Sequence, residues 1–173
     1  MFIDINTIGP EGLAFERSLN LDGLEGPSRE RIPAVPARLA GSVGPSERGP
    51  HVAGKLEATV PLTCSRCLES FPWDIRSEFD LRVVAHEPDD DSVEVDENAV
   101  EALVAPEGKI GLEDLAREQL YLNLPLKPIC RPDCKGLCPV CGVNRNVTAC
   151  GCATEDVDPR MAPLLEFRKK IEP

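Results

Sequence analysis

The cysteines of this chain occur in four close pairs, and this pattern limits how the polypeptide can fold around them. The chain has 173 residues and eight cysteines. Eight thiols are enough for two sites of four sulfur ligands, the usual complement of a structural zinc site. The pairs are Cys64/Cys67, Cys130/Cys134, Cys138/Cys141 and Cys150/Cys152. The spacing therefore predicts that the fold gathers cysteines around one or two metal ions.

The C-terminal pairs predict the first site. Cys138 and Cys141 are separated by two residues and followed by Gly142, so a tight turn can direct both sulfurs at one ion while glycine accepts the positive φ of such a knuckle. Cys150 and Cys152 follow at a distance that one compact loop can close. We expect these four thiols to form a single four-cysteine site.

The remaining four cysteines predict a second site. Cys64 and Cys67 are far in sequence from Cys130 and Cys134, so a shared ion would fasten the middle of the chain to its C-terminal segment. Disulfides or free buried thiols are the alternatives to metal binding. The N-terminus lacks the basic region of an export signal, and no apolar run is long enough to span a membrane. We therefore expect a cytoplasmic protein, in which disulfides are uncommon.

Zinc is the expected metal, with one or two Zn²⁺ ions per chain. Iron is the rival, because a Cys-Pro-x-Cys-Gly knuckle also resembles half of a rubredoxin site, but the later Cys-x-Cys does not complete that pattern. A thioredoxin-like redox role for Cys64 and Cys67 would require a helix N-terminus to lower a thiol pKa. The flanking sequence predicts strands instead.

Periodicity predicts an α+β fold, with an antiparallel β-sheet core covered by a helix and a cysteine-rich, zinc-binding C-terminal segment. Apolar residues alternate over residues 52 to 62 and 75 to 83, which predicts two strands joined by a hairpin that contains Cys64 and Cys67. Shorter strands are expected near residues 2 to 5, 13 to 19 and 37 to 43. An apolar stripe predicts a helix over 112–124, ended by Pro125.

Two domains are expected, a β-rich core over residues 1–125 and a metal-binding segment over residues 126–173 that ends in a helix. Residues 86–101 are rich in carboxylates and lack lysine and arginine, so they predict a solvated acidic loop that a basic partner could order. The C-terminal helix begins near Asp158 and carries Arg168, Lys169 and Lys170 in its last turn. These cations suit the helix dipole or a phosphate contact.

Several motifs follow one another in a fixed order along the chain. They are Cys64-Ser-Arg-Cys-Leu-Glu69, Glu118-Gln-Leu-Tyr-Leu-Asn-Leu-Pro-Leu-Lys-Pro-Ile-Cys130, Cys134-Lys-Gly-Leu-Cys-Pro-Val-Cys-Gly-Val-Asn-Arg-Asn146, and Cys150-Gly-Cys152 before Asp158-Pro-Arg160. Together they resemble the YceD family of large ribosomal RNA subunit accumulation proteins. The resemblance covers roughly residues 52 to 165. It implies a bacterial cytoplasmic factor, not a known catalyst, that supports accumulation or processing of large-subunit (23S) ribosomal RNA. Arg145 replaces the apolar residue expected between the two asparagines.

The function favoured by the sequence is a non-enzymatic ribosome biogenesis factor with structural zinc. The formal charge of −11 excludes a general cationic surface, so contact with precursor rRNA would use a local patch at Arg131, Lys135 and Arg145, or a basic ribosomal protein. No small-molecule substrate is indicated. The alternative is a zinc- or iron-binding redox protein or hydrolase that uses the Cys-x-x-Cys motifs. His51 and His86 are expected to be exposed and complete no catalytic zinc pattern.

Overall fold

A computed structural model of the chain describes residues 1–27, 29–47, 49–84, 102–153 and 164, and the structural statements below concern these residues. The chain divides into two compact units. Unit 1 comprises residues 1–64 and 69–130, and unit 2 comprises residues 65–68 and 131–173. The predicted acidic loop at 86–101 lies outside the described residues, as does the predicted C-terminal helix apart from Leu164.

Within the described residues of unit 1, five strands form the main sheet, in the order β2-β5-β6-β7-β8. The strands are β2 (Leu13–Leu21), β5 (Val35–Ser46), β6 (Gly49–Thr63), β7 (Ser70–Val84) and β8 (Ala102–Val104). Neighbours pair antiparallel except β7 and β8, which pair parallel. The sheet is therefore mixed at one edge, a detail that the expected antiparallel core did not include.

The described residues of unit 1 also form two smaller antiparallel strand pairs and two short 3-10 helices. β1 (Phe2–Asp4) pairs with β9 (Lys109–Gly111), and β3 (Leu24–Glu25) pairs with β4 (Arg31–Ile32). The 3-10 helices span Ile5–Thr7 and Pro106–Gly108. The pairing of β1 with β9 places the start of the chain beside the residues that lead into the helix.

The pairing of β6 with β7 follows the alternation predicted from sequence. The two strands pair continuously from His51 opposite Arg82 to Thr63 opposite Ser70. Val52, Leu56, Val60 and Leu62 are fully buried on one face, and Ile75, Phe79 and Val83 are buried beside them. Since successive side chains in a strand point to opposite faces, this alternation fixes the register of the pair.

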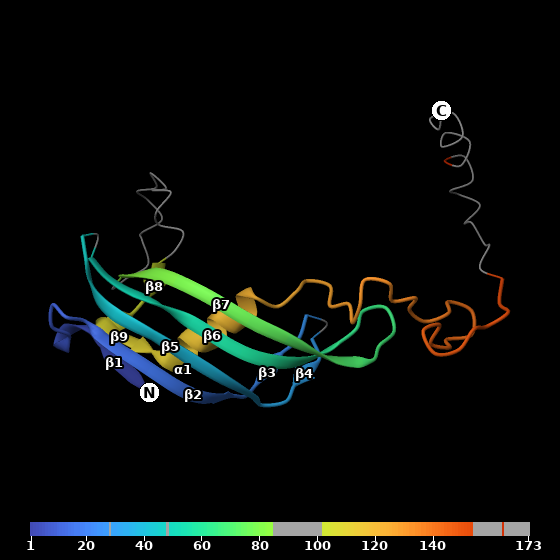
Figure 1. Ribbon diagram of the computed structural model, residues 1–173, viewed down its shortest axis with the longest axis horizontal. Helices are drawn as coiled ribbons and strands as arrows, with labels where there is room; N and C mark the ends of the chain where they lie inside the picture. The colour runs from blue at the N-terminus through green and yellow to red at the C-terminus, as the bar shows by residue number, and fades with distance from the viewer. Residues whose placement is uncertain (28, 48, 85–101, 154–163, 165–173) are drawn as a thin grey trace. The chain divides into compact units, whose positions relative to one another are not determined.

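Helix α1 (Leu112–Leu122) packs on the apolar face of the sheet (Figure 1). The apolar stripe predicted from sequence is buried, with Leu112, Leu115, Ala116 and Leu120 each no more than 1% exposed. The helix ends two residues earlier than predicted, because the N–H of Asn123 already closes the last turn. Glu113 and Asp114 lie in the first turn, where their negative charges stabilise the helix by interacting with the positive end of its dipole.

Among the residues that the structure describes, Ser77 and Gln119 form a buried polar pair between the sheet and the helix. The hydroxyl of Ser77 on β7 donates to the side-chain oxygen of Gln119 on α1 at 3.3 Å, and both residues are buried. A buried polar group without a partner is costly, so this contact favours one seating of the helix on the sheet. The hydrophobic pattern did not predict Gln119 as a buried residue.

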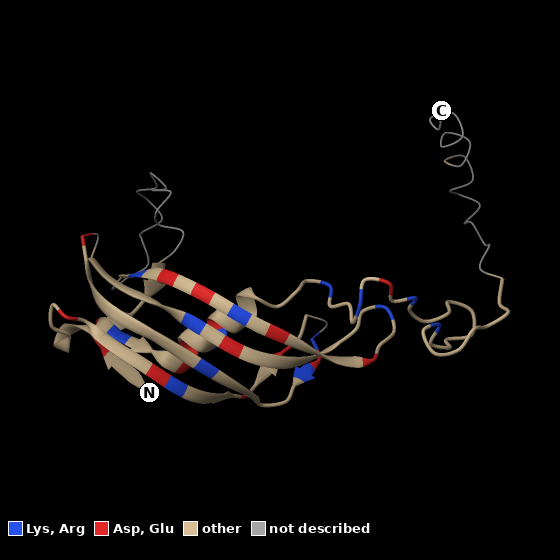
Figure 2. Ribbon diagram, viewed as in Figure 1, with Lys and Arg blue, Asp and Glu red and all other residues tan. Residues whose placement is uncertain are grey.

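The solvent face of the main sheet carries charges of both signs. Lys55 on β6 lies 2.6 Å from Glu78 on β7, and Arg38 on β5 lies 2.6 Å from Glu16 on β2. The hydrogen bond from Lys55 lowers the pKa of Glu78, and the hydrogen bond to Glu78 raises the pKa of Lys55. Acidic and basic residues also interleave along the strands (Figure 2). This face is therefore not a continuous cationic surface.

The exposure of His51 differs from the sequence-based prediction that this residue is exposed. Strand β6 begins at Gly49, before the predicted start near residue 52, and therefore includes His51. The side chain is half-buried opposite Arg82. His86 lies outside the described residues. No helix among the described residues is long and apolar enough to cross a membrane.

Replacement of Leu120 by alanine tests the packing of the helix on the sheet. Leu120 is fully buried, so Leu120→Ala is expected to lower the free energy of unfolding by about 2–5 kcal/mol. Leu122 lies on the same helix but is 70% exposed, so Leu122→Ala is expected to change it by less than about 0.5 kcal/mol. Urea unfolding followed by circular dichroism measures both, and equal effects would contradict the packing.

Candidate metal centres

The first cysteine pair lies in the loop that joins β6 to β7. The strands stop pairing at Thr63 and Ser70, and the N–H of Cys64 then donates to the carbonyl of Glu69 at 2.9 Å. Leu68, directly after Cys67, has φ of 60°. A left-handed conformation is unfavourable for leucine and is tolerated where surrounding structure enforces it. Leu68 is 64% exposed, so burial of its side chain does not compensate for this conformation.

The Cys138 pair repeats the backbone design of the first loop. The N–H of Cys138 donates to the carbonyl of Val143 at 2.8 Å, five residues along the chain, just as Cys64 bonds to Glu69. Gly142, directly after Cys141, has φ of 73°, and its N–H donates to the carbonyl of Cys138. The two Cys-x-x-Cys loops thus share one closure and one left-handed residue. Neither Cys-x-x-Cys motif lies at the N-terminus of a described helix, which disfavours a thioredoxin-like arrangement.

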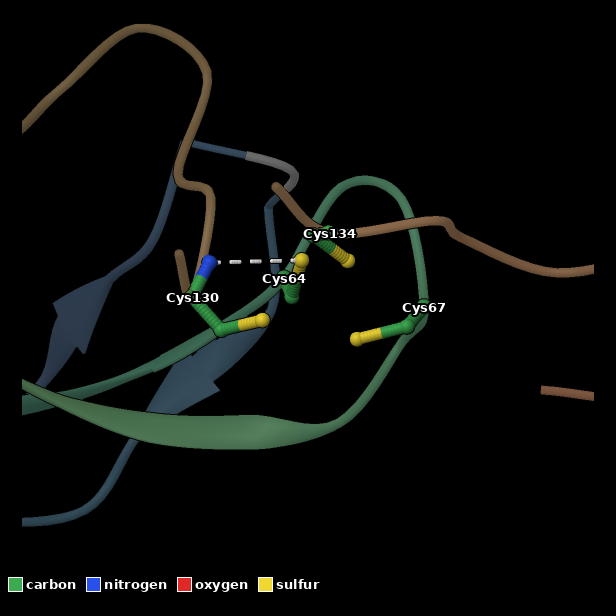
Figure 3. Close-up of side chains that lie close together, drawn as sticks. All are labelled: Cys64, Cys67, Cys130 and Cys134. Atoms are coloured by element: carbon green, nitrogen blue, oxygen red, sulfur yellow. Dashed lines mark hydrogen bonds between the residues drawn. The ribbon is translucent and has the colours of Figure 1, made fainter. Parts of the chain in front are cut away.

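The structure gathers Cys64, Cys67, Cys130 and Cys134 into one cluster, called here the Cys64 cluster. Their sulfur atoms all lie within 4.8 Å of one another, and Figure 3 shows the four side chains converging. Cys64, Cys67 and Cys134 are buried and Cys130 is half-buried. The backbone N–H of Cys130 donates to the sulfur of Cys64 at 3.4 Å, an interaction that stabilises a thiolate more than a neutral thiol.

The other four thiols form a second group, called here the Cys138 cluster. The sulfur atoms of Cys138, Cys141, Cys150 and Cys152 also lie within 4.8 Å of one another. Burial is less complete here, because Cys141 is exposed and Cys150 and Cys152 are half-buried. The N–H groups of Val147 and Thr148 both donate to the carbonyl of Asn144, and this turn directs the chain back toward the last two cysteines.

Both clusters can hold a metal ion. A tetrahedral ion with metal–sulfur bonds of about 2.3 Å separates its sulfurs by about 3.8 Å, which the observed limit of 4.8 Å accommodates. Four thiolates also saturate a tetrahedral ion and leave no position for substrate. This donor chemistry is consistent with zinc, although iron accepts the same four sulfurs.

The thiols of the Cys138 cluster have unequal pKa values. The backbone N–H groups of Cys141 and Val140 donate to the sulfur of Cys138 and lower its pKa to about 6. The hydrogen bond with Cys138 raises the pKa of Cys150, and the hydrogen bond with Cys141, together with burial, raises the pKa of Cys152 to about 12. At neutral pH, the lowered pKa of Cys138 therefore favours its thiolate, the form that a metal ion requires.

The three predicted RNA-binding cations are exposed on unit 2. Arg131 lies 3.5 Å from Asp133, so an acid partly neutralises it. The N–H of Lys135 donates to the side chain of Asn146, and the N–H of Arg145 donates to the carbonyl of Gly136. Lys135 and Arg145 therefore occupy facing segments of one small hairpin.

Comparison with known proteins identifies the family. The family described as large ribosomal RNA subunit accumulation protein YceD matches residues 52–168, which include every cysteine of both clusters. The chain belongs to the YceD family. Family membership agrees with the resemblance of the ordered cysteine motifs. The family description refers to large ribosomal RNA and assigns no ligand to either cluster.

Relatives of this YceD chain occur in bacteria and plants. An uncharacterized protein of Mycobacterium tuberculosis is 37% identical over 119 residues, which are 69% of this chain and 56% of the relative. A maize protein named large ribosomal RNA subunit accumulation protein YCED homolog 1, chloroplastic, is 26% identical over 180 residues, with 90% of this chain and 61% of the relative covered. An Arabidopsis thaliana protein of the same name is 26% identical, with 80% and 50% covered.

The YceD chain spans about half to three-fifths of the length of the curated relatives it matches. No solved structure matches it significantly. The relatives therefore support the family assignment and its connection with ribosomal RNA. The geometry of the two clusters comes from the present structure alone.

Sequence reasoning missed two residues that the structure places beside this YceD chain's cysteines. Arg66 donates through Nη1 to the carbonyls of Cys134 at 3.0 Å and Pro132 at 3.4 Å, so it joins the segment that carries Arg131 and Lys135. Asn146 donates to the sulfur of Cys134 at 3.4 Å. Asn146 belongs to the Asn-Arg-Asn motif, which could have indicated it. Arg66 lies too far in sequence from Cys134 for any local pattern to relate the two.

Metal affinity of the Cys138 cluster is expected to rise steeply with pH. The lowered pKa of Cys138 keeps it deprotonated above pH 6, whereas Cys150 and Cys152, with raised pKa values, must each lose a proton on binding. Two released protons predict a gain of at least about 100-fold in zinc affinity per pH unit near pH 7. The slope steepens below pH 6, where Cys138 is also protonated.

Competition with a chelator of known proton affinities, on a Cys64→Ser/Cys67→Ser chain, measures this slope between pH 5 and 8. An affinity that does not change with pH would contradict the assigned protonation states. Because serine replaces both cysteines of the hairpin, the remaining zinc signal reports the Cys138 cluster.

Proposed function

We propose that this chain is a non-enzymatic, cytoplasmic ribosome biogenesis factor that supports accumulation or processing of large-subunit ribosomal RNA. The observation that carries the proposal is membership of the YceD family over residues that include all eight cysteines. Relatives in maize and Arabidopsis carry names that refer to large ribosomal RNA subunit accumulation. Contact with precursor rRNA, a basic ribosomal protein or both would provide the mechanism.

The RNA-binding patch that we propose consists of Arg66, Arg131, Lys135 and Arg145. All four are exposed, and Asp133 is the single acid among the described residues of unit 2. Arginine and lysine contact phosphates, and arginine also stacks on unpaired bases. The patch is local, because two filled four-thiolate sites would each contribute a net charge of about −2. It therefore suits a short RNA element and not a long duplex.

A basic ribosomal protein is the second proposed partner. The whole chain has 30 acidic and 19 basic residues, and the stretch at 86–101 concentrates carboxylates in sequence. Opposite charge on a ribosomal protein would speed its association with this chain. The acidic chain would thus act as an adaptor, with the cationic patch reserved for RNA.

We assign a structural role to the metal that the two clusters would hold. Buried thiols from distant parts of the sequence occur together in the Cys64 cluster, and cross-linking them through an ion would stabilise the loops that present the cationic patch. A closed set of four sulfurs disfavours Lewis-acid catalysis. The same cysteines therefore support the redox or hydrolase hypothesis less well than the structural role.

Elemental analysis of untagged protein is expected to give about two zinc ions per chain. Cys138→Ser/Cys141→Ser and Cys64→Ser/Cys67→Ser should each retain one ion, because each variant disrupts one cluster and leaves the other complete. Absence of metal, with eight titratable thiols, would disprove the structural-metal role. Iron in place of zinc would change the assigned metal and leave the ligand groups intact.

Crosslinking with ultraviolet light in growing cells, followed by sequencing of the recovered RNA, tests the RNA contact. Large-subunit precursor RNA is expected at a defined position. The triple variant Arg131→Gln/Lys135→Gln/Arg145→Gln should lose most of this signal. In vitro, the loss of three phosphate contacts should reduce the dependence of log affinity on log salt concentration by about 2 to 3.

A charge-matched control separates a patch from general electrostatics. Arg31→Gln/Lys55→Gln/Arg76→Gln removes the same charge from exposed positions of unit 1 and should retain binding. Equal losses in both triple variants would mean that no specific patch exists. Absence of RNA above background in the unmodified protein would leave the protein-only adaptor as the remaining form of the proposal.

A further inference from the structure

The two clusters share one small hairpin. The N–H of Cys138 donates to Val143, and the N–H of Arg145 donates to Gly136, so residues 136–138 pair with residues 143–145. Leu137 and Asn144 form the antiparallel bridge between them. Cys138 and Cys141 stand at the closed end of this hairpin and Cys134 precedes its open end. One short element of backbone therefore carries ligands of both clusters.

Asn146 closes the open end of the hairpin against Cys134. Its side-chain oxygen accepts the N–H of Lys135 at 2.8 Å, and its amide nitrogen donates to the sulfur of Cys134 at 3.4 Å and to the side-chain oxygen of Asn144 at 2.8 Å. A backbone N–H can only donate, so the atom facing Lys135 is the oxygen. The nitrogen must then face the sulfur, which fixes the orientation of the amide.

Asn144 holds Asn146 in this orientation. Its side-chain oxygen accepts both the backbone N–H of Asn146 at 3.0 Å and the side-chain N–H at 2.8 Å. Both asparagines are half-buried. Both N–H groups of the Asn146 side chain, and one acceptor direction of its oxygen, are thus used within the hairpin. The arrangement resembles the outer partners that orient ligands around metals, whose loss commonly costs 10- to 100-fold in affinity.

We propose that Asn146 is a positioning residue for Cys134, and that the hairpin from Cys134 to Asn146 couples metal binding at the two clusters. The inference rests on the metal centres of the proposed function and adds to them an interaction between the sites. An N–H directed at sulfur stabilises the thiolate that an ion requires. It also holds the sulfur in place before the ion arrives.

Coupling follows from the shared cost of ordering the hairpin. An ion bound by Cys138 and Cys141 fixes the closed end, and the backbone pairs transmit that order to Asn146. The Cys64 cluster then binds its ion to a chain in which Cys134 is already oriented, so less conformational entropy is lost. Thermodynamic linkage makes the effect reciprocal, and couplings of this kind commonly amount to about 5- to 150-fold.

Gly136 keeps the hairpin close to the first loop of unit 2. It has φ of 69°, and a Cβ at this position would lie 3.0 Å from the carbonyl oxygen of Arg66. That same oxygen accepts the N–H of Leu137 at 2.9 Å. The segment that follows Cys134 is therefore fixed on both sides, by Arg66 and by Asn146, which leaves little freedom for an alternative position of the ligand.

The test compares zinc affinities of the full chain, measured by competition with a chromophoric chelator. Asn146→Asp retains the oxygen that accepts from Lys135 but removes the N–H that faces the sulfur and adds a negative charge. It is expected to weaken zinc binding at the Cys64 cluster by about 10- to 100-fold. Asn144→Ala removes only the support of the amide and should produce a smaller loss at the same cluster.

A double-mutant cycle tests the coupling. Cys138→Ser/Cys141→Ser disables the other cluster and should weaken the Cys64 cluster several-fold in a chain that retains Asn146. The same double substitution should have little further effect once Asn146→Asp is present, because the route between the clusters is already broken. Additive losses would overturn the coupling, and an unchanged affinity in Asn146→Asp would overturn the positioning role.

Asn20→Asp is the matched control, since it makes the same chemical change at an exposed position on β2, and it should leave both affinities unchanged. Circular dichroism and zinc stoichiometry at saturating metal verify that each variant remains folded. If the unmodified chain binds no zinc, the proposed metal centres fail, and this inference fails with them. Two tightly bound ions with an inert Asn146 would overturn the inference alone.

Discussion

The continuous pairing of β6 with β7 is the interaction on which the rest of unit 1 depends. It presents the apolar face that α1 covers, and it ends at Thr63 and Ser70, where the Cys64 loop begins. A change of register by one residue would turn Val52, Leu56 and their neighbours toward solvent. The hydrophobic core therefore sets the position of the first knuckle, because both are built on the same strands.

The two Cys-x-x-Cys loops achieve the same closure with different residues. Gly142 adopts its left-handed conformation at little cost, whereas Leu68 adopts a similar φ against the preference of its side chain. Both loops have a backbone hydrogen bond from the first cysteine to the fifth residue after it. Repetition of this detail at two unrelated points of the chain favours a common purpose, which is to direct paired sulfurs at one centre.

In the proposed function, the charged sheet of unit 1 and the cysteine loops of unit 2 have different roles. Opposite charges on the open face of the sheet are paired across strands, as Lys55 with Glu78 and Arg38 with Glu16 show. The four cations of unit 2 face a single described acid. An acidic protein can thus keep a small surface suited to phosphate, provided that the cysteine loops hold those cations in place.

Sequence by itself determined the strands around β6 and β7, the buried stripe of α1 and the close pairing of the cysteines along the chain, because alternation, helical period and ligand spacing are local properties. Only the tertiary structure placed Arg66 beside the segment of Lys135, buried Gln119 against Ser77, and directed Asn146 at the sulfur of Cys134. Each of the first two contacts joins residues that no local pattern relates, and the third depends on the side-chain geometry of a folded hairpin. Such contacts arise only after packing has fixed the backbone, so their geometry cannot be read from spacing alone.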